Sequence, residues 1–194
     1  MIGYWFSSLN RELRYDDGRV AEVGVTHRVD TDRPLVLCEY GLHASKRAMG
    51  ALNYAPGPYA WKVKLSGEIV HGDDKSVAYE RTYLAGFDAT DVMREFARKC
   101  ALDVVHLWDA PDVVVQYLET GDPDIRAAAR DAAVDVAVDA AGDAAREAAG
   151  DAAWYAAAAA GTAAGDAARY AQNRRLAQNR RLDQMLSKGF KESK

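Results

Sequence analysis

Apolar and polar residues alternate along two neighbouring stretches in the first half of the chain. In YAWKVKLSGEIV, residues 59–70, Trp61, Val63 and Leu65 share one parity and two lysines share the other. This alternation is typical of a half-buried β-strand. After the turn-forming HGDDK, the segment SVAYERTYLAGF, residues 76–87, predicts its antiparallel neighbour.

Shorter strand signals come earlier in the chain. The segment GRVAEVGVTHRV, residues 18–29, alternates and follows the turn signal YDDG, which predicts a hairpin. The apolar run PLVLC, residues 34–38, has the length of a strand. The segment SKRAMGALNYAPG predicts one short helix, with Ser45 as its capping residue and Pro-Gly as its stop.

The hydrophobic period changes from two to between three and four at Asp88, which predicts an amphipathic helix. A second helix is expected in DAPDVVVQYLETGD, with Asp109 as its cap, Pro111 in its first turn and Gly121 as its stop. A third begins at Asp122. A sheet followed by successive helices predicts the α+β class.

Two changes along the sequence divide the chain into three parts. The hydrophobic period changes at Asp88, and aromatic and β-branched residues give way to alanine near Gly121. We predict a small antiparallel β-rich head domain over 1–87 and two packing helices over 88–121. A long Ala/Asp-rich helical segment with a basic C-terminal tail is expected over 122–194, as one helix or a folded-back hairpin.

Charge is distributed unevenly within that last segment. Residues 122–168 carry three basic and nine acidic groups, a net charge of −6, whereas residues 169–194 carry eight and two, a net charge of +6. The acids recur at every fourth position in RDAAVDVAVDAAGDAAREAAGDAAW, and like charges at that spacing destabilise an isolated helix. The repeated hexad AQNRRL in the tail offers compensating arginines together with leucines.

We therefore predict that the helical segment self-associates into a homo-oligomer or docks a protein partner; the alternative is a solvated alanine helix without a partner. The residues expected at such an interface are Asp135, Asp139, Asp143, Trp154, Tyr155, Arg174, Arg175, Leu176, Arg180, Arg181 and Leu182. Nucleic-acid binding through the segment Arg174–Arg181 has weaker support, because the basic tail and the acidic helix can neutralise each other.

Several classes of protein lack their usual sequence signals. The two cysteines are far apart and neither lies in a CxxC or CxxH spacing, which argues against a disulfide framework or a zinc site. No apolar run is long enough for a membrane span, so we expect a soluble, cytoplasmic protein. GxSxG, Walker, GxGxxG and HExxH motifs are absent, and we predict no cofactor and no metal.

Two clusters of polar residues are candidate binding sites. LCEYGLHASKRAM, residues 37–49, places polar side chains before a predicted helix N-terminus, which attracts anions, and HGDDK groups charges in a turn. The alternative is structural: a serine cap, a histidine bonded to a buried carbonyl, and a charged hairpin turn. No catalytic residue is assigned, although His43 and Ser45 are candidates for one. The ligand-binding candidates are Cys38, Glu39, His43, Ser45, Arg47, Asp73, Asp74 and Lys75.

The segments LCEYGLHAS, ALNYAPG, WKVKLSGEIV and DDKSVA resemble those of a family of uncharacterised phage and prophage proteins, some with an alanine-aspartate tail ending in AQNRRL. The resemblance implies a non-enzymatic accessory protein in the host cytoplasm that binds a protein partner, for example to inhibit a defence system such as CRISPR-Cas. A fainter similarity to ADP-ribosyltransferase-like folds implies, as the alternative, a small enzyme with His43 and Ser45 at the edge of an NAD site.

Overall fold

The computed structural model describes residues 1–15, 17–103, 105–107, 109–135 and 163–193, with side chains from residue 176 onward in the last range. The chain forms two compact units, Met1–Arg94 with Gln178–Lys194, and Glu95–Ala177. The first unit thus combines the head with the end of the tail, a different division from the one that composition indicated at residues 87 and 121. The α+β class is confirmed.

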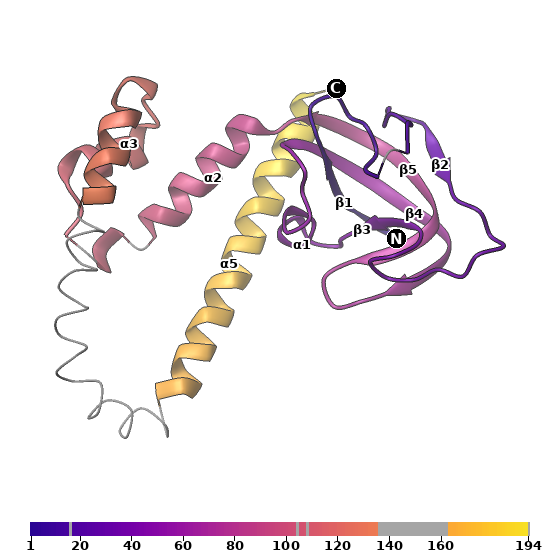
Figure 1. The fold of residues 1–194 in the computed structure, drawn as a ribbon. Helices are drawn as coiled ribbons and strands as arrows, with labels where there is room; N and C mark the ends of the chain where they lie inside the picture. Colours follow the sequence, from indigo (N-terminus) through magenta and orange to yellow (C-terminus); the bar gives the residue numbers. More distant parts are fainter. Residues whose placement is uncertain (16, 104, 108, 136–162, 194) are drawn as a thin grey trace. The chain divides into compact units, whose positions relative to one another are not determined.

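The first unit is built on five antiparallel strands: β1 (Ile2–Ser7), β2 (Thr26–Arg28), β3 (Leu42–Ala44), β4 (Tyr59–His71) and β5 (Ser76–Asp88) (Figure 1). The strand order is β1-β4-β5-β2, and β3 also pairs with β5. A bridge joins Tyr4 to Ser45, just beyond β3, through reciprocal backbone hydrogen bonds of 2.8 and 3.0 Å. Because of this bridge, β1, β4, β5 and β3 form a closed ring of pairings.

The hairpin of β4 and β5 forms the core of the unit. Trp61, Val63 and Leu65 are 1%, 0% and 0% exposed, which confirms the predicted inward face. The indole Nε1 of Trp61 donates to the hydroxyl of Ser7 at 3.0 Å, so its polar atom has a partner. Register shifts interrupt the β4–β5 pairing, one of them near Gly67 with φ +77, and such bulges help a sheet to curl.

One predicted strand is wrong, one prediction holds only in part, and two strands, β1 and β3, were not predicted. Within residues 18–29 only Thr26–Arg28 is a strand, and residues 34–38 form none, because the chain turns at 37–39 between the bridged residues Val36 and Tyr40. Cys38 has φ +69, a left-handed conformation incompatible with a strand. Of the two strands that were not predicted, β1 has the sequence IGYWFS, which lacks a clear alternation, and β3 is only three residues long.

The short helix α1 (Ala48–Leu52) lacks the predicted serine cap. The backbone of Ser45 pairs with β1 and places this residue ahead of the helix. The backbone N–H of Ala48 donates instead to Asp183 Oδ1 at 2.9 Å, from the helix α5 (Ala163–Glu192). A residue 135 positions away therefore occupies the helix N-terminus at which an anion site was expected.

Replacing Asp183 with alanine should lower the free energy of unfolding of the first unit by about 1 kcal/mol, because Ala48 loses its capping acceptor. Urea denaturation followed by circular dichroism measures this difference. Gln184→Ala, on an exposed neighbouring residue, is the control and should change the free energy by less than about 0.5 kcal/mol. Equal effects of the two substitutions would contradict the assignment of the cap.

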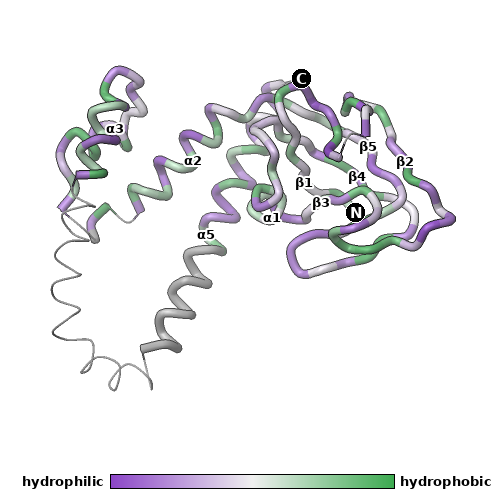
Figure 2. Tube along the Cα trace, viewed as in Figure 1, coloured by the Kyte–Doolittle hydropathy of each residue, from purple (hydrophilic) through white to green (hydrophobic). Residues whose placement is uncertain are grey.

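The last turns of α5 contribute side chains to the core of the first unit. Leu182 and Leu186 are 0% exposed, and Phe190 packs edge-on against Phe87 with ring centroids 5.0 Å apart. A Cβ atom on Gly189 would lie 2.2 Å from the Phe87 ring, so only glycine allows this approach. Hydrophobic and hydrophilic residues alternate along these turns (Figure 2), and the hydrophobic ones are buried in this unit.

The second unit contains most of α2 (Thr90–Leu102), η1 (Val105–Leu107), α3 (Asp112–Thr120), η2 (Pro123–Ile125), a helical stretch over 126–135 and the first part of α5, up to Ala177. Gly121 ends α3 with φ +72, as predicted, and Asp122 caps η2 through the N–H of Asp124 at 2.9 Å. The cap of α3 is Pro111 where Asp109 was expected. Among the described residues, no helix has the length and hydropathy needed to cross a membrane.

Candidate functional site

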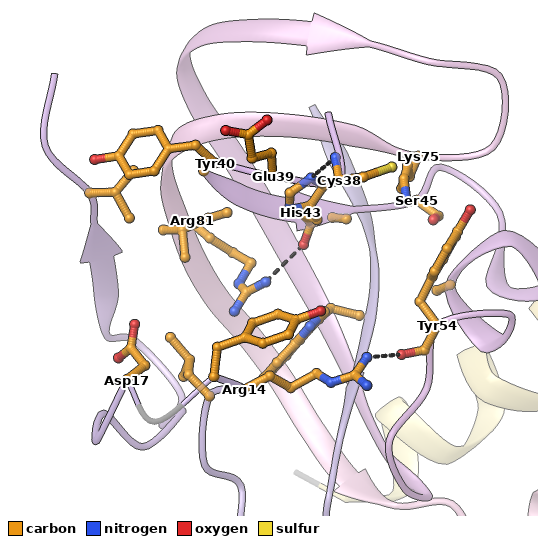
Figure 3. A pocket seen from close by; sticks show the side chains of 18 of the residues that line it. Arg14, Asp17, Cys38, Glu39, Tyr40, His43, Ser45, Tyr54, Lys75 and Arg81 are labelled. Carbon is orange, nitrogen blue, oxygen red and sulfur yellow. Dashed lines mark hydrogen bonds between the residues drawn. The ribbon is translucent and has the colours of Figure 1, made fainter. Parts of the chain in front are cut away.

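The first unit contains a cleft of about 780 Å³, which we call the Arg81 cleft (Figure 3). Its wall is formed by residues of β1, β3, α1 and β5 and by the segments that precede β2, β3, β4 and β5. The volume lies in the range of small-molecule sites. Four cationic side chains line it: Arg14, Arg33, Lys75 and Arg81.

Arg81 is the most buried of these cations, at 3% exposed. Its Nη1 donates to the backbone carbonyl of His43 at 2.8 Å, and its Nε and Nη2 donate to the hydroxyl of Tyr83 at 3.2 and 2.9 Å. The guanidinium lies 3.9 Å from the ring centroid of Trp5, a cation–π distance. These contacts hold the guanidinium firmly in one orientation.

No carboxylate forms an ion pair with Arg81 in the described part of the chain. The charge of Asp17, another lining residue, acts on Arg81 at longer range and favours its charged form. Burial raises the pKa of Tyr83, so its hydroxyl is a neutral acceptor. Burial also lowers the pKa of Arg81, which reflects the cost of an uncompensated charge. Of the five guanidinium N–H groups, one on Nη1 and one on Nη2 do not donate to any described residue.

His43 connects two backbone segments of the cleft wall. Its Nε2 accepts the backbone N–H of Cys38 at 3.0 Å, and the backbone of Gly41 is a second hydrogen-bond partner. Burial, followed by the charge of Lys75, lowers the pKa of His43, so the ring is neutral near pH 7. This geometry agrees with the structural alternative for His43 and leaves neither ring nitrogen available as a general base.

The rim of the cleft near Cys38 carries a second cation. The Lys75 ammonium lies 3.8 Å from the ring centroid of Tyr54, and its hydrogen bond with Cys38 raises the pKa of Lys75. Tyr54 donates its hydroxyl to Asp74 Oδ2 at 2.8 Å, and its backbone carbonyl accepts from Arg14 Nη1 at 3.1 Å. These partners hold the Tyr54 ring at the mouth of the cleft, as Figure 3 shows.

The structure brings five of the eight predicted ligand-binding residues to this cleft. The five are Cys38, Glu39, His43, Ser45 and Lys75, whereas Arg47, Asp73 and Asp74 do not line it. Arg47 is exposed at the start of α1, and Asp73 and Asp74 are exposed in the turn between β4 and β5.

Sequence reasoning missed the residues that give the cleft its charge and its aromatic rim. Arg81 shares parity with Val77 and Tyr83 in a predicted strand, and an arginine at an inward position was the available signal. Arg14 and Tyr54 lie in loops without a distinguishing pattern.

The residues predicted to lie at an oligomer or partner interface differ in their exposure. Leu182 is buried in the first unit and so is not available to a second chain. Asp135, Leu176 and Arg180 are exposed and Arg181 is partly exposed, while the side chains of Arg174 and Arg175 are outside the described set. The remaining four predicted residues lie outside the described ranges: Asp139, Asp143, Trp154 and Tyr155.

No three His, Cys, Asp or Glu side chains converge on a possible metal position within the described ranges. In particular, Cys38, Glu39, His43 and His71 do not form such a group. The hydrogen bonds in the Arg81 cleft instead join cationic side chains to backbone carbonyls and to the phenol of Tyr83.

Below pH 6.5 the free energy of unfolding of the first unit should decrease with decreasing pH. Burial, followed by the charges of Arg19 and Arg81, lowers the pKa of His27 from 6.5, and His43 is shifted in the same direction. The unfolded chain therefore binds protons that the folded imidazoles do not bind. The free energy of unfolding stops decreasing once the pH is below the folded pKa values of the two histidines. Urea titrations above and below pH 6.5 measure this change in the free energy of unfolding.

The substitution His27→Gln should flatten this pH dependence, because it removes one of the two shifted groups. The matched control is His106→Gln, at an exposed position of η1, which should leave the slope unchanged. An unchanged slope in the His27 variant would contradict the role of this group.

Comparison of the chain with protein-family models, with curated proteins and with solved structures found no match. The functional argument therefore depends on the geometry of the cleft.

Proposed function

We propose that the first unit is a binding module for a small anionic ligand, and that Arg81 is its principal recognition group. The observation that carries this proposal is that Arg81 is 3% exposed and lines an open cleft, and that no carboxylate in the described chain forms an ion pair with it. A buried charge without an ion-pair partner is costly, and strongly perturbed ionisable groups that line a cleft are typical of functional sites.

The form of the free guanidinium edge indicates how the anion binds. Tyr83 accepts from Nε and Nη2 on one side, and the His43 carbonyl accepts from Nη1. The remaining N–H on each terminal nitrogen can donate to two oxygens of one carboxylate or phosphate, the bidentate arrangement that arginine favours.

The proposal predicts that inorganic diphosphate raises the unfolding temperature of the full chain in a concentration-dependent way, because a ligand that binds only the folded state stabilises it. Sodium chloride at equal ionic strength is the control and should give a much smaller shift. Arg81→Met should abolish the response to diphosphate, and circular dichroism establishes whether that variant is folded. If diphosphate and chloride act equally on the wild type, the proposal is wrong.

A second variant keeps this test informative if Arg81→Met does not fold. Lys75→Gln changes a partly exposed rim cation that belongs to the same cleft. It should weaken diphosphate binding several-fold, whereas Lys99→Gln, on α2 in the second unit, should not. Equal affinities in these two variants would argue against the cleft as the anion site.

Self-association through the helical segment and capture of a host protein remain separate proposals. The exposed Leu176 and Arg180 of α5 support them, because an aliphatic and a cationic group stay accessible beside the buried face of that helix. Light scattering on the full chain tests the oligomeric state. An ADP-ribosyltransferase-like activity at His43 and Ser45 has no geometric support, since His43 is bonded to the backbone and Ser45 is 2% exposed.

A further inference from the structure

The rim tyrosine Tyr54 has the properties of a stacking platform. Tyr54 is 43% exposed although its hydroxyl, its backbone carbonyl and one ring face all have partners within the first unit. An aromatic side chain held this way loses little conformational entropy when a flat ligand stacks on it. Because the Lys75 ammonium covers one face of the ring, only the opposite face is open to such a ligand.

A second tyrosine is held in a similar way across the cleft. The hydroxyl of Tyr40 donates to the Asp30 carbonyl at 2.9 Å, and the guanidinium of Arg33 lies 4.4 Å from its ring centroid. Figure 3 shows Tyr40 and Tyr54 on opposite sides of the cleft, with Arg81 between them in that view. Aromatic walls thus flank the cationic centre.

The charges that line the cleft favour a ligand with more than one negative charge. The acidic lining residues Asp17 and Glu39 already form ion pairs, with Arg19 and Arg33 respectively. The other three lining cations are without an ion-pair partner in the described chain, and they are Arg14, Lys75 and Arg81. A single monovalent anion would leave most of this charge uncompensated.

Flat walls and several free cations together identify a chemical class. We propose that the ligand of the Arg81 cleft is a free nucleoside diphosphate, whose phosphates bind Arg81 and Lys75 and whose base stacks on Tyr54. This assignment rests on the proposed anion-binding function and adds the base to it. The cleft of about 780 Å³ has room for both parts of such a ligand.

Isothermal titration calorimetry of the full chain with ADP, UDP, inorganic diphosphate and adenosine tests the assignment. The two nucleotides should bind at least tenfold more tightly than diphosphate, and adenosine should bind more weakly than either nucleotide. Tyr54→Leu should lower the affinity for ADP by about 5-fold to 100-fold, which is the range expected for loss of one base–aromatic stack. It should leave diphosphate binding unchanged within twofold.

Tyr54→Phe is the matched variant, because it keeps the ring and removes only the hydrogen bond to Asp74. It should retain most of the ADP affinity. Equal ADP affinities in the leucine and phenylalanine variants would show that the ring does not stack on a base, and would overturn the assignment.

The outcomes separate this assignment from the proposed function. If diphosphate binds as tightly as ADP and Tyr54→Leu changes neither affinity, the assignment of a nucleoside diphosphate is wrong, although the cleft still binds anions. If ADP binds and Arg81→Met does not weaken it, the anion site itself is wrong. A 5′-phosphorylated tetranucleotide that binds more tightly than ADP would overturn the free nucleotide in favour of a nucleic-acid end.

Discussion

Replacing Leu186 with alanine should lower the free energy of unfolding of the first unit by about 2–5 kcal/mol. Leu186 lies near the C-terminus, yet it is 0% exposed in the same unit as the N-terminal strand. The substitution removes buried methyl groups and leaves a cavity beside Leu182 and Phe190, which are one helical turn away on the same face of α5. Urea denaturation of the full chain, monitored by tryptophan fluorescence, measures the loss.

The chain offers a matched control in Leu176→Ala, on the same helix at 37% exposure. That substitution should cost less than about 1 kcal/mol, because an exposed side chain leaves no cavity. Similar losses in the two variants would contradict the packing of the tail in the first unit. For the same reason, a chain that ends at Thr120 lacks part of the first unit, and truncations that test self-association should retain residues 178–194.

Removing the hydroxyl of Tyr83 should cost about 3 kcal/mol of stability, because Tyr83→Phe deprives a buried guanidinium of an acceptor that takes two of its N–H groups. The same hydroxyl lies 3.0 Å from Nδ1 of His27, so the substitution leaves a second buried polar group without this partner. Denaturant titration at neutral pH measures the loss.

Tyr79→Phe is the control for this prediction, because its hydroxyl donates to the Arg33 carbonyl in an exposed environment. We expect a change of less than about 1 kcal/mol there. The double variant Tyr83→Phe with Arg81→Met should be less destabilised than the sum of its two single changes, since it removes both partners of one network. Strict additivity would mean that the two side chains do not stabilise each other.

Predictions from periodicity were most accurate where a segment was long. The alternation over residues 59–70 and 76–87 correctly identified β4 and β5, and local signals correctly placed Gly121 and Asp122 at helix ends. The short run at 34–38 was misread, because a few apolar residues do not specify their pairing partner and the chain turns at Cys38.

The candidate site was recovered in part for a comparable reason. The motif around His43 and the charged turn before β5 contributed five residues that line the cleft. Arg81 and Tyr54 were missed because each acquires its role from distant partners. The Arg81 guanidinium is held by the carbonyl of His43 and by the Trp5 ring, and Tyr54 is held by Arg14 and Asp74.

The sequence by itself determined those features whose physics is local. A period of two placed Trp61, Val63 and Leu65 on one buried face, and glycine at Gly121 allowed the left-handed residue that ends a helix. Only the tertiary structure decided the features that depend on residues far apart in the chain. The cap of α1 comes from Asp183, because the chain returns to the first unit at α5. The cleft likewise depends on distant residues: the bridge between Tyr4 and Ser45 closes the ring of strands, and Arg81 lies among residues from segments throughout the first 81 positions, an arrangement that no local pattern encodes.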